Sequence, residues 1–249
     1  MICAIKWNTQ SIDEWEKKFS LVPRSNILQS YVYALAHCPV EKQRARWGLI
    51  EIDGREAGLV QIFEAGILWN ALHALILDRG PLWFEGYGNA MHVKCFFDEL
   101  NRQFPKRKGR KRRILPETED GTTAQKMIAQ TGLEYSGKGY ETIWLDLTPD
   151  EDALQTSMKA NWRNKLSKAT RAGLRIDWSI DDSVLSWLTC LYAADKSARG
   201  YGGPSPELLR RYAPLLAIRG DLLVGRAFAG DDPVAFVLLV CHGRSATYL

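Results

Sequence analysis

Six cations lie between residues 153 and 176, a stretch that contains no acidic residue. Solvated helices usually alternate the two signs of charge, because an acid and a base four residues apart stabilise each other. A row of cations without carboxylates therefore indicates a site for an anion such as phosphate, and a solvated basic surface is the alternative. The six residues are Lys159, Arg163, Lys165, Lys168, Arg171 and Arg175.

The element that must carry these cations is a helix. Asn161 is a favourable N-cap and Gly173 a favourable C′ residue, so the sequence predicts a helix over residues 162–172. The preceding helix is predicted to begin within residues 148–151, with a capping box and a proline at its first position. At about 100° per residue, Trp162, Leu166 and Ala169 share one face of the basic helix, Arg163, Lys168 and Arg171 the opposite arc, and Lys165 the border.

A second basic run, KRKGRKRR, occupies residues 106–113. We interpret it as a solvated connection between a helix and a strand. Such runs bind nucleic acid or anionic lipid only when other contacts are presented beside them.

Composition narrows the class of protein. The 249 residues carry a formal net charge of +4, so the charge asymmetry is local rather than global. Five scattered cysteines without C-x-x-C spacing argue against disulfides and structural zinc, and favour a reducing compartment. The apolar stretch over residues 57–77 contains four polar residues, too many for a spanning helix. We expect a cytoplasmic protein, and an interfacial association with a membrane-bound substrate stays open.

Motifs for several kinds of chemistry are missing from the sequence. It contains no P-loop, no G-x-G-x-x-G after a strand, no H-E-x-x-H and no G-x-S-x-G, and its four histidines lie in unrelated contexts. No catalytic residue is therefore assigned, and we expect neither a metal nor a resident cofactor. Cation clusters without a nucleophile suit direct transfer between two bound substrates, with no covalent intermediate.

Helical and β-rich segments alternate along the chain, which predicts an α/β (α+β) fold with mixed sheets flanked by helices. The Asp53-Gly54 pair predicts a hairpin. A similar hairpin follows in the second half, so we expect two copies of one unit, in domains 1–140 and 141–249. The second copy stops inside its third predicted strand, so we expect a fragment; the alternative is that a partner supplies the missing edge of the sheet. Helices are predicted over 11–19, 26–37, 89–104, 122–130, 182–197 and 206–218, and strands over 46–52, 55–63, 72–77, 113–115, 141–147, 174–180, 222–229 and 234–240.

An ordered set of short motifs resembles the FemABX family over nearly the whole chain. Each motif alone is weak, and their order is fairly specific. They are Gln29-Ser30-(x2)-Tyr33, Arg79-Gly80-Pro81-Leu82-Trp83, Arg113-Ile114-Leu115-Pro116-Glu117, Thr142-Ile143-Trp144-Leu145-Asp146-Leu147 and Trp162-Arg163-Asn164-(x4)-Ala169-(x3)-Gly173.

This resemblance implies two domains related to the GNAT acyltransferase fold. It also implies that the amine of a peptidoglycan precursor attacks an aminoacyl-tRNA ester without a metal. Tyr33 matches the aromatic position after Gln29, His37 stands where the family has a phosphate-contacting lysine, and Arg163 matches a second phosphate contact. The family's closing strand, helix and strand are missing from this chain. The predicted substrate-binding residues are Gln29, Tyr33, His37, Arg163, Lys165, Lys168 and Arg171.

Two other functions remain open from the sequence. The first is an N-acyltransferase of the GNAT type that takes acyl-CoA as donor, although the Gly-rich loop that usually holds pyrophosphate is not visible. The second is a module without catalysis that binds nucleic acid or another polyanion through residues 106–113 and the basic helix. The transferred group, the acceptor and the oligomeric state are not predicted.

Overall fold

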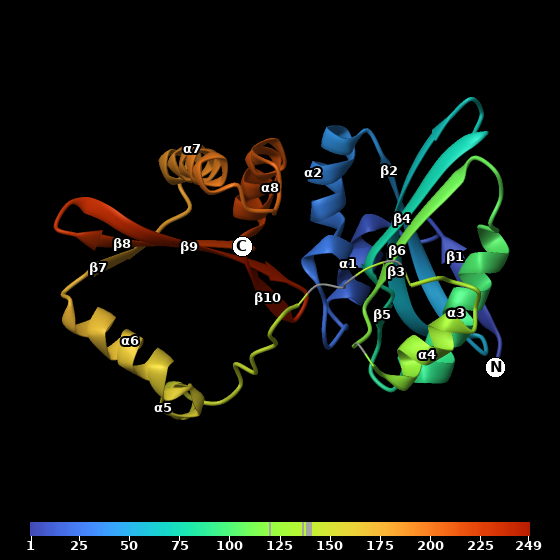
Figure 1. The fold of residues 1–249 in the computed structure, drawn as a ribbon, viewed down its shortest axis with the longest axis horizontal. Coiled ribbons are helices and arrows are strands. Elements are labelled where there is room, and N and C mark those ends of the chain that lie inside the picture. Colours follow the sequence, from blue (N-terminus) through green and yellow to red (C-terminus); the bar gives the residue numbers. More distant parts are fainter. Residues whose placement is uncertain (120, 136, 138–140) are drawn as a thin grey trace.

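The computed structural model describes residues 1–119, 121–135, 137 and 141–249, which form two lobes. The sheet of the first lobe has six strands in the order β1-β2-β3-β4-β6, with β5 paired to β3, and that of the second has four in the order β10-β9-β8-β7. Figure 1 shows the two sheets in separate lobes with α2 and α8 between them. The predicted boundary at residue 140 falls outside the described residues and stays a prediction.

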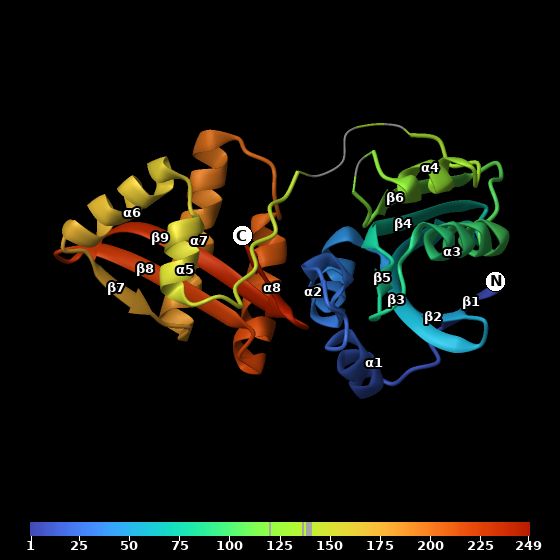
Figure 2. The same cartoon turned by 90° about the horizontal axis from the view of Figure 1, so that it is seen from below.

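In the first lobe, strands β1 to β4 pair antiparallel in succession and β6 pairs parallel to β4. Helices α3 and α4 cover one face, where Phe96 and Phe97 are fully buried against the strands, and α1 and α2 lie on the other (Figure 2). The elements are β1 (Cys3–Trp7), α1 (Ile12–Phe19), a 3₁₀ turn (Ile27–Gln29), α2 (Tyr31–Glu41), β2 (Arg44–Ile52), β3 (Arg55–Ile67), β4 (Leu72–Gly80), β5 (Leu82–Trp83), α3 (Ala90–Gln103), β6 (Arg110–Pro116) and α4 (Thr123–Ala129).

Local sequence signals account for much of this lobe. The predicted capping box is present, since the Ser11 side chain accepts from the Glu14 backbone and the Glu14 carboxylate accepts from the Ser11 backbone. Asp53 and Gly54 both have positive φ, as the tight turn between β2 and β3 requires. Asn89 caps α3 through the backbone N–H groups of Met91 and His92.

Two predictions for the first lobe are wrong. The helix expected over 26–37 is interrupted, because Ser30 has extended backbone and caps a new helix, α2, which continues past Pro39 to Glu41. The basic run over 106–113, expected to be a solvated connection, is one only in its first half, because the last four residues, from Arg110, belong to β6. Pairing with β4 therefore decides which way those cations point.

In the second lobe every strand pair is antiparallel, and α7 and α8 cover one face of the sheet (Figure 1). Leu188 of α7 and Ala213 of α8 pack there with Val224 and Val240 of the strands, all fully buried. The elements are α5 (Glu151–Ser157), α6 (Ala160–Arg171), β7 (Arg175–Trp178), α7 (Asp182–Arg199), α8 (Pro206–Arg219), β8 (Leu222–Ala229), β9 (Asp232–His242) and β10 (Ser245–Tyr248).

Three predictions for the second lobe are wrong. Residues 141–147 form no strand: from residue 141 they have no regular structure, and their apolar side chains are exposed. The cap of α5 is Asp150, which accepts from the Ala153 backbone, so Pro149 precedes the helix. Helix α6 begins at Ala160, which places the expected N-cap Asn161 inside the first turn. Gly173 does follow the helix with positive φ, as expected.

The two lobes share a hydrophobic core. Val32 and Ala36 of α2 are buried in one cluster with Leu209 and Tyr212 of α8. Helix α2 thus carries side chains of the first lobe into the contact between the lobes. Among the described residues, no helix is long and apolar enough to cross a bilayer.

Candidate substrate-binding site

Helix α2 positions two of the predicted site residues. The Ser30 side chain accepts from the Tyr33 backbone at 3.2 Å and so begins the helix. Four residues apart on one face, the Tyr33 and His37 rings stack with centroids 5.1 Å apart. The edge of the Tyr212 ring lies against Tyr33 at 5.8 Å. The structure therefore brings Tyr33 and His37 together, beside the second lobe.

A cavity of about 450 Å³ opens beside His37. Because β6 pairs parallel to β4, with Lys111 opposite Ala74 and Arg113 opposite Ile76, these two cations fall on the face of the sheet that lines the cavity. We call this cavity the cationic pocket. Its lining is His37, Glu41, Gln43, Ala74, Leu75, Ile76, Lys111 and Arg113.

The charges of the cationic pocket are partly paired. The Arg113 guanidinium donates to both carboxylate oxygens of Asp78, at 2.9 and 2.6 Å. Burial raises the pKa of Asp78, and the neighbouring Arg113 opposes that rise. Lys111 is exposed and has no carboxylate partner among the described residues. Glu41 also lines the pocket, so the carboxylates of Glu41 and Asp78 balance the two cations. An anion can therefore be held there by direct contacts from Lys111 and Arg113, and not by an excess of positive charge.

His37 contributes a neutral ring rather than a charge. Burial lowers its pKa, so the imidazole is uncharged at neutral pH. Its Nε2 lies 3.3 Å from the Gln43 side-chain oxygen, which makes Nε2 the protonated nitrogen. His37 stands where the resemblance implies a lysine, and in this chain Lys111 and Arg113 supply the positive charge at the same pocket.

Gln29, predicted to bind substrate, has a different position. Its side chain is 0% exposed. The amide nitrogen donates to the Gln61 carbonyl at 3.0 Å and to the Asp78 carbonyl at 2.7 Å, and the amide oxygen accepts from the Gln61 backbone at 2.7 Å. Since every polar atom of this buried side chain is held by backbone, the structure gives Gln29 a positioning role in the first sheet, and substrate binding by Gln29 stays a prediction.

The four predicted cations of α6 do not join the cationic pocket, whose lining includes none of them. None of the described residues of α6 is buried, and the helix lies on the side of the second sheet opposite α7 and α8 (Figures 1 and 2). Lys165 lies over the Trp162 ring, Arg171 donates to the Ser167 carbonyl, and Lys168 is exposed. Anion binding by Arg163, Lys165, Lys168 and Arg171 stays a prediction.

Arg163 has a structural partner that the sequence did not indicate. Its guanidinium donates to the Thr156 carbonyl at 2.7 Å and to the Met158 carbonyl at 2.6 Å, at the end of α5. We expect Arg163→Ala to loosen the α5–α6 junction, raising amide hydrogen exchange over residues 156–162 while changing the free energy of global unfolding by less than about 1 kcal/mol. Lys165→Ala is the control. Equal exchange in both variants would contradict the assignment.

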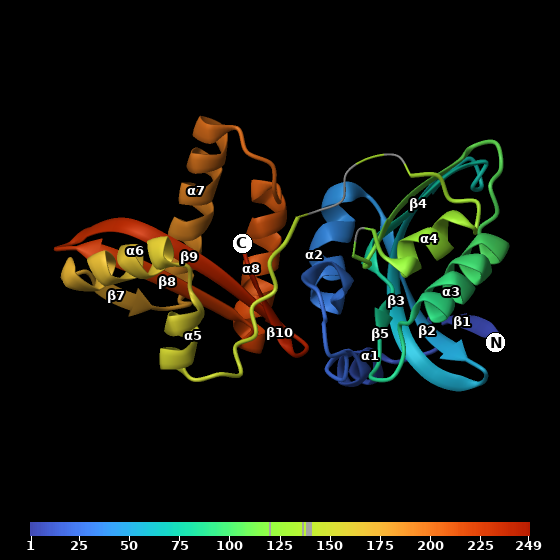
Figure 3. The ribbon, with the colours of Figure 1, turned by 60° about the horizontal axis from the view of Figure 1, so that its bottom comes forward.

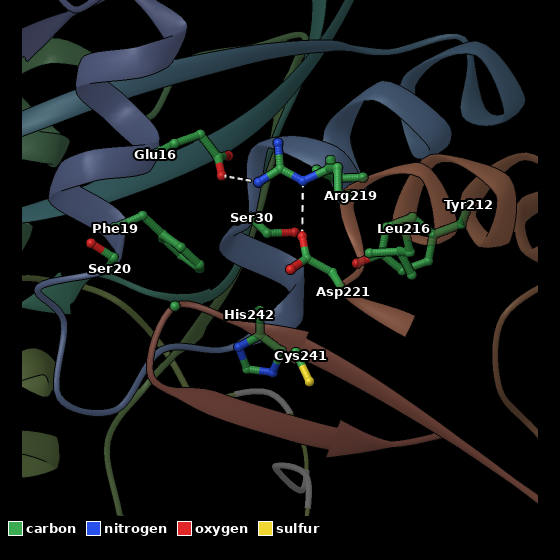
Figure 4. A pocket seen from close by; sticks show the side chains of 12 residues that line it. Glu16, Phe19, Ser20, Ser30, Tyr212, Leu216, Arg219, Asp221, Cys241 and His242 are labelled. Carbon is green, nitrogen blue, oxygen red and sulfur yellow. Dashed lines mark hydrogen bonds and ion pairs between the residues drawn. The ribbon is translucent and has the colours of Figure 1, made fainter. Parts of the chain in front are cut away.

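A second cavity, of about 160 Å³, lies between the lobes (Figure 4). Arg219 of α8 donates to Glu16 of α1 and, at 2.8 Å, to Asp221. The guanidinium thus joins a carboxylate of the first lobe to one of the second. No sequence signal predicted this triad, because Arg219 and Glu16 are 203 positions apart.

His242 closes the lower side of this cavity (Figure 4). Its Nδ1 lies 3.2 Å from the Ser25 hydroxyl of the first lobe, and its Nε2 lies 2.7 Å from the Thr247 hydroxyl. The Ser25 hydroxyl also donates to the His242 carbonyl at 2.7 Å. Burial, with Arg79 as a smaller contributor, lowers the pKa of His242 to about 4. Neutral His242 therefore contributes one of the contacts between the lobes, through Ser25.

Residues 156–249 match the family described as "Acetyltransferase (GNAT) domain". No curated protein matches the sequence significantly. Among solved structures, that of FemX superposes with a TM-score of 0.66 at 17% sequence identity, covering 94% of this chain and 58% of FemX. The chain thus spans somewhat more than half the length of FemX. It is a protein of FemX-like, two-lobed fold, whose second lobe matches the GNAT acetyltransferase domain.

Proposed function

We propose that this protein is an acyltransferase of the FemABX type, which moves an aminoacyl group from tRNA to an amine of a peptidoglycan precursor. The observation that carries the proposal is the likeness to FemX, which extends over both lobes and 94% of the chain. The match of residues 156–249 to a GNAT acetyltransferase domain supports the transfer of an acyl group. The cationic pocket supplies a place for the phosphates of an acceptor.

The proposed reaction is a direct displacement. The acceptor amine attacks the carbonyl of the aminoacyl ester, a C–N bond forms, and the ester C–O bond breaks. The tRNA hydroxyl leaves with a proton, and the amine loses one. Lys111 and Arg113 hold the acceptor phosphates beside the His37 ring, which lines the pocket and is held by the stacked Tyr33 ring next to it. Rate enhancement then comes from positioning the two substrates and neutralising phosphate charge.

Acyl-CoA is the second candidate donor, favoured by the description of the matched family as an acetyltransferase. A direct test offers the chain one acceptor, a nucleotide-linked muropeptide, with either aminoacyl-tRNA or acetyl-CoA. Mass spectrometry of the muropeptide then identifies the group transferred. Product from aminoacyl-tRNA alone supports the first candidate, and product from acetyl-CoA alone supports the second. Binding of polyanions without product would favour a module without catalysis.

The role of the cationic pocket in acceptor binding can be tested by mutation. We expect Lys111→Gln to raise the acceptor KM about tenfold while kcat changes little, because one charge-assisted hydrogen bond to phosphate is lost. Arg102→Gln, on α3 at the opposite face of the sheet, is a matched control with an exposed side chain paired to Glu99. A KM that is equal in the two variants would exclude this pocket as the acceptor site.

A further inference from the structure

The turn between β3 and β4 exposes an unusual set of apolar side chains. Trp69 is 101% exposed, and its neighbours Ile67 and Leu68 are 63% and 66% exposed. Leu72, which begins β4, is exposed as well. A fully exposed tryptophan that follows two exposed aliphatic side chains loses favourable burial free energy in water, so such a set marks a contact surface.

The backbone of this turn is strained. Leu68, Trp69 and Asn70 all have positive φ, at 52°, 51° and 65°. The left-handed region costs a residue other than glycine, asparagine or aspartate about 1 kcal/mol, so Leu68 and Trp69 bear the strain. A turn built from asparagine and glycine would have the same shape without the cost. The presence of leucine and tryptophan at these strained positions therefore indicates that their side chains bind something.

Cations of one neighbouring connection lie beside the turn. The connection from α3 to β6 lies against it, since Arg107 donates to the carbonyls of Asn70 and Ala71 and Gly109 accepts from the His73 backbone. Figures 1 and 3 show the two loops together at one end of the first lobe. Lys106 and Lys108 are exposed beside it. Among the described residues, Arg107 and Lys108 have no carboxylate partner, and Lys106 has only the exposed Glu134, at 3.7 Å.

We propose that this end of the first lobe docks on the surface of an anionic membrane. Ile67, Leu68 and Trp69 would enter the interface between headgroups and acyl chains, where tryptophan is favoured, and the lysines beside them would meet acidic headgroups. The basic run over residues 106–113 therefore lies beside exposed apolar side chains, which are the additional contacts that such a run needs to bind a lipid surface. The cationic pocket begins at Ala74, two residues along β4 from Leu72, so docking would hold that pocket close to the lipid surface.

A membrane fits these observations better than a nucleic acid does. Proteins bind single strands in a groove in which aromatic rings stack on successive bases. Here the apolar group is a projecting turn with one aromatic ring and two aliphatic side chains. Aliphatic side chains gain from entering hydrocarbon and gain little from stacking on a base.

The test is flotation of the full chain with vesicles. One set contains phosphatidylcholine with about one third phosphatidylglycerol, and the other contains phosphatidylcholine alone. We expect binding to the anionic vesicles that weakens at high salt and is much weaker on the neutral ones. Leu68→Ser with Trp69→Ser should reduce binding at least about tenfold. Lys106→Glu with Lys108→Glu should reduce it at least about 20-fold, since each cation near the surface contributes about fivefold.

Matched controls separate docking from general attraction. Trp162→Ser replaces another exposed tryptophan, and Lys165→Glu with Lys168→Glu replaces two exposed cations of α6. Both controls should float like the parent chain, and circular dichroism should show all variants folded, because the changed side chains are exposed. Equal losses in the α6 controls would overturn the proposal. So would unchanged flotation of the turn variants, or a turn that is required for binding single-stranded RNA and not vesicles.

Discussion

Replacement of Gln29 by alanine is expected to lower the free energy of unfolding by about 4 kcal/mol. The reason lies in the sheet of the first lobe. Strand β3 pairs with β4 only from Phe63 onward and with β5 only at Gly58 and Leu59. The backbone of Gln61 lies between these two ladders, and the Gln29 amide pairs with both its N–H and its carbonyl. Without that amide, buried backbone groups lose their partners and a cavity opens.

Urea unfolding of the parent and variant chains measures this change directly. Gln43→Ala is the matched control, because its side chain is only partly buried and contacts His37 at 3.3 Å. We expect the control to lose less than about 1 kcal/mol. A Gln29→Ala variant with the stability of the control would show that the strands close over the gap without the amide.

Some elements could be predicted because their causes are local. The capping box at Ser11 and the turn at Asp53 and Gly54 depend on residues within a few positions of each other, and both are present. The apolar pattern over residues 141–147 is equally suited to a strand, yet none forms. A strand also needs a neighbouring strand to pair with, and pairing is decided by residues distant in sequence.

The candidate site shows the same division between local and distant causes. Tyr33 and His37 meet because they are one helical turn apart, which the sequence predicts. Lys111 and Arg113 line the pocket because of the register in which β6 pairs with β4. The basic sequence over residues 106–113 does not predict that register. Gln29 is predicted as a ligand from the resemblance, whereas its hydrogen bonds to backbone atoms 32 and 49 positions away could not be predicted, because such distant partners carry no sequence signature.

The contact between the lobes should weaken in acid, and His242 is the main reason. His242 is only 7% exposed, and its ring faces Ser25, Thr247, Arg79 and Asp221. Its pKa is about 4 in the folded protein and about 6.5 when unfolded, so the unfolded chain binds the proton more tightly. The stabilisation is therefore complete above pH 6.5 and is lost as the pH falls from 6.5 to 4. This loss amounts to about 3 kcal/mol.

His242→Gln isolates this contribution, because glutamine keeps a hydrogen-bonding side chain but does not titrate. Carboxylates titrate alike in both proteins, so the parent should lose about 3 kcal/mol more than the variant between pH 7 and pH 4 in urea unfolding. Burial also lowers the pKa of His37, which makes stability fall with pH in the same direction. Both proteins therefore carry His37→Gln, so that only His242 differs between them. Parallel stability curves would mean that the protonated ring finds a partner in the folded protein. Diverging curves would show that His242 resists protonation in the folded protein, at a position where its ring contacts Ser25 of the other lobe.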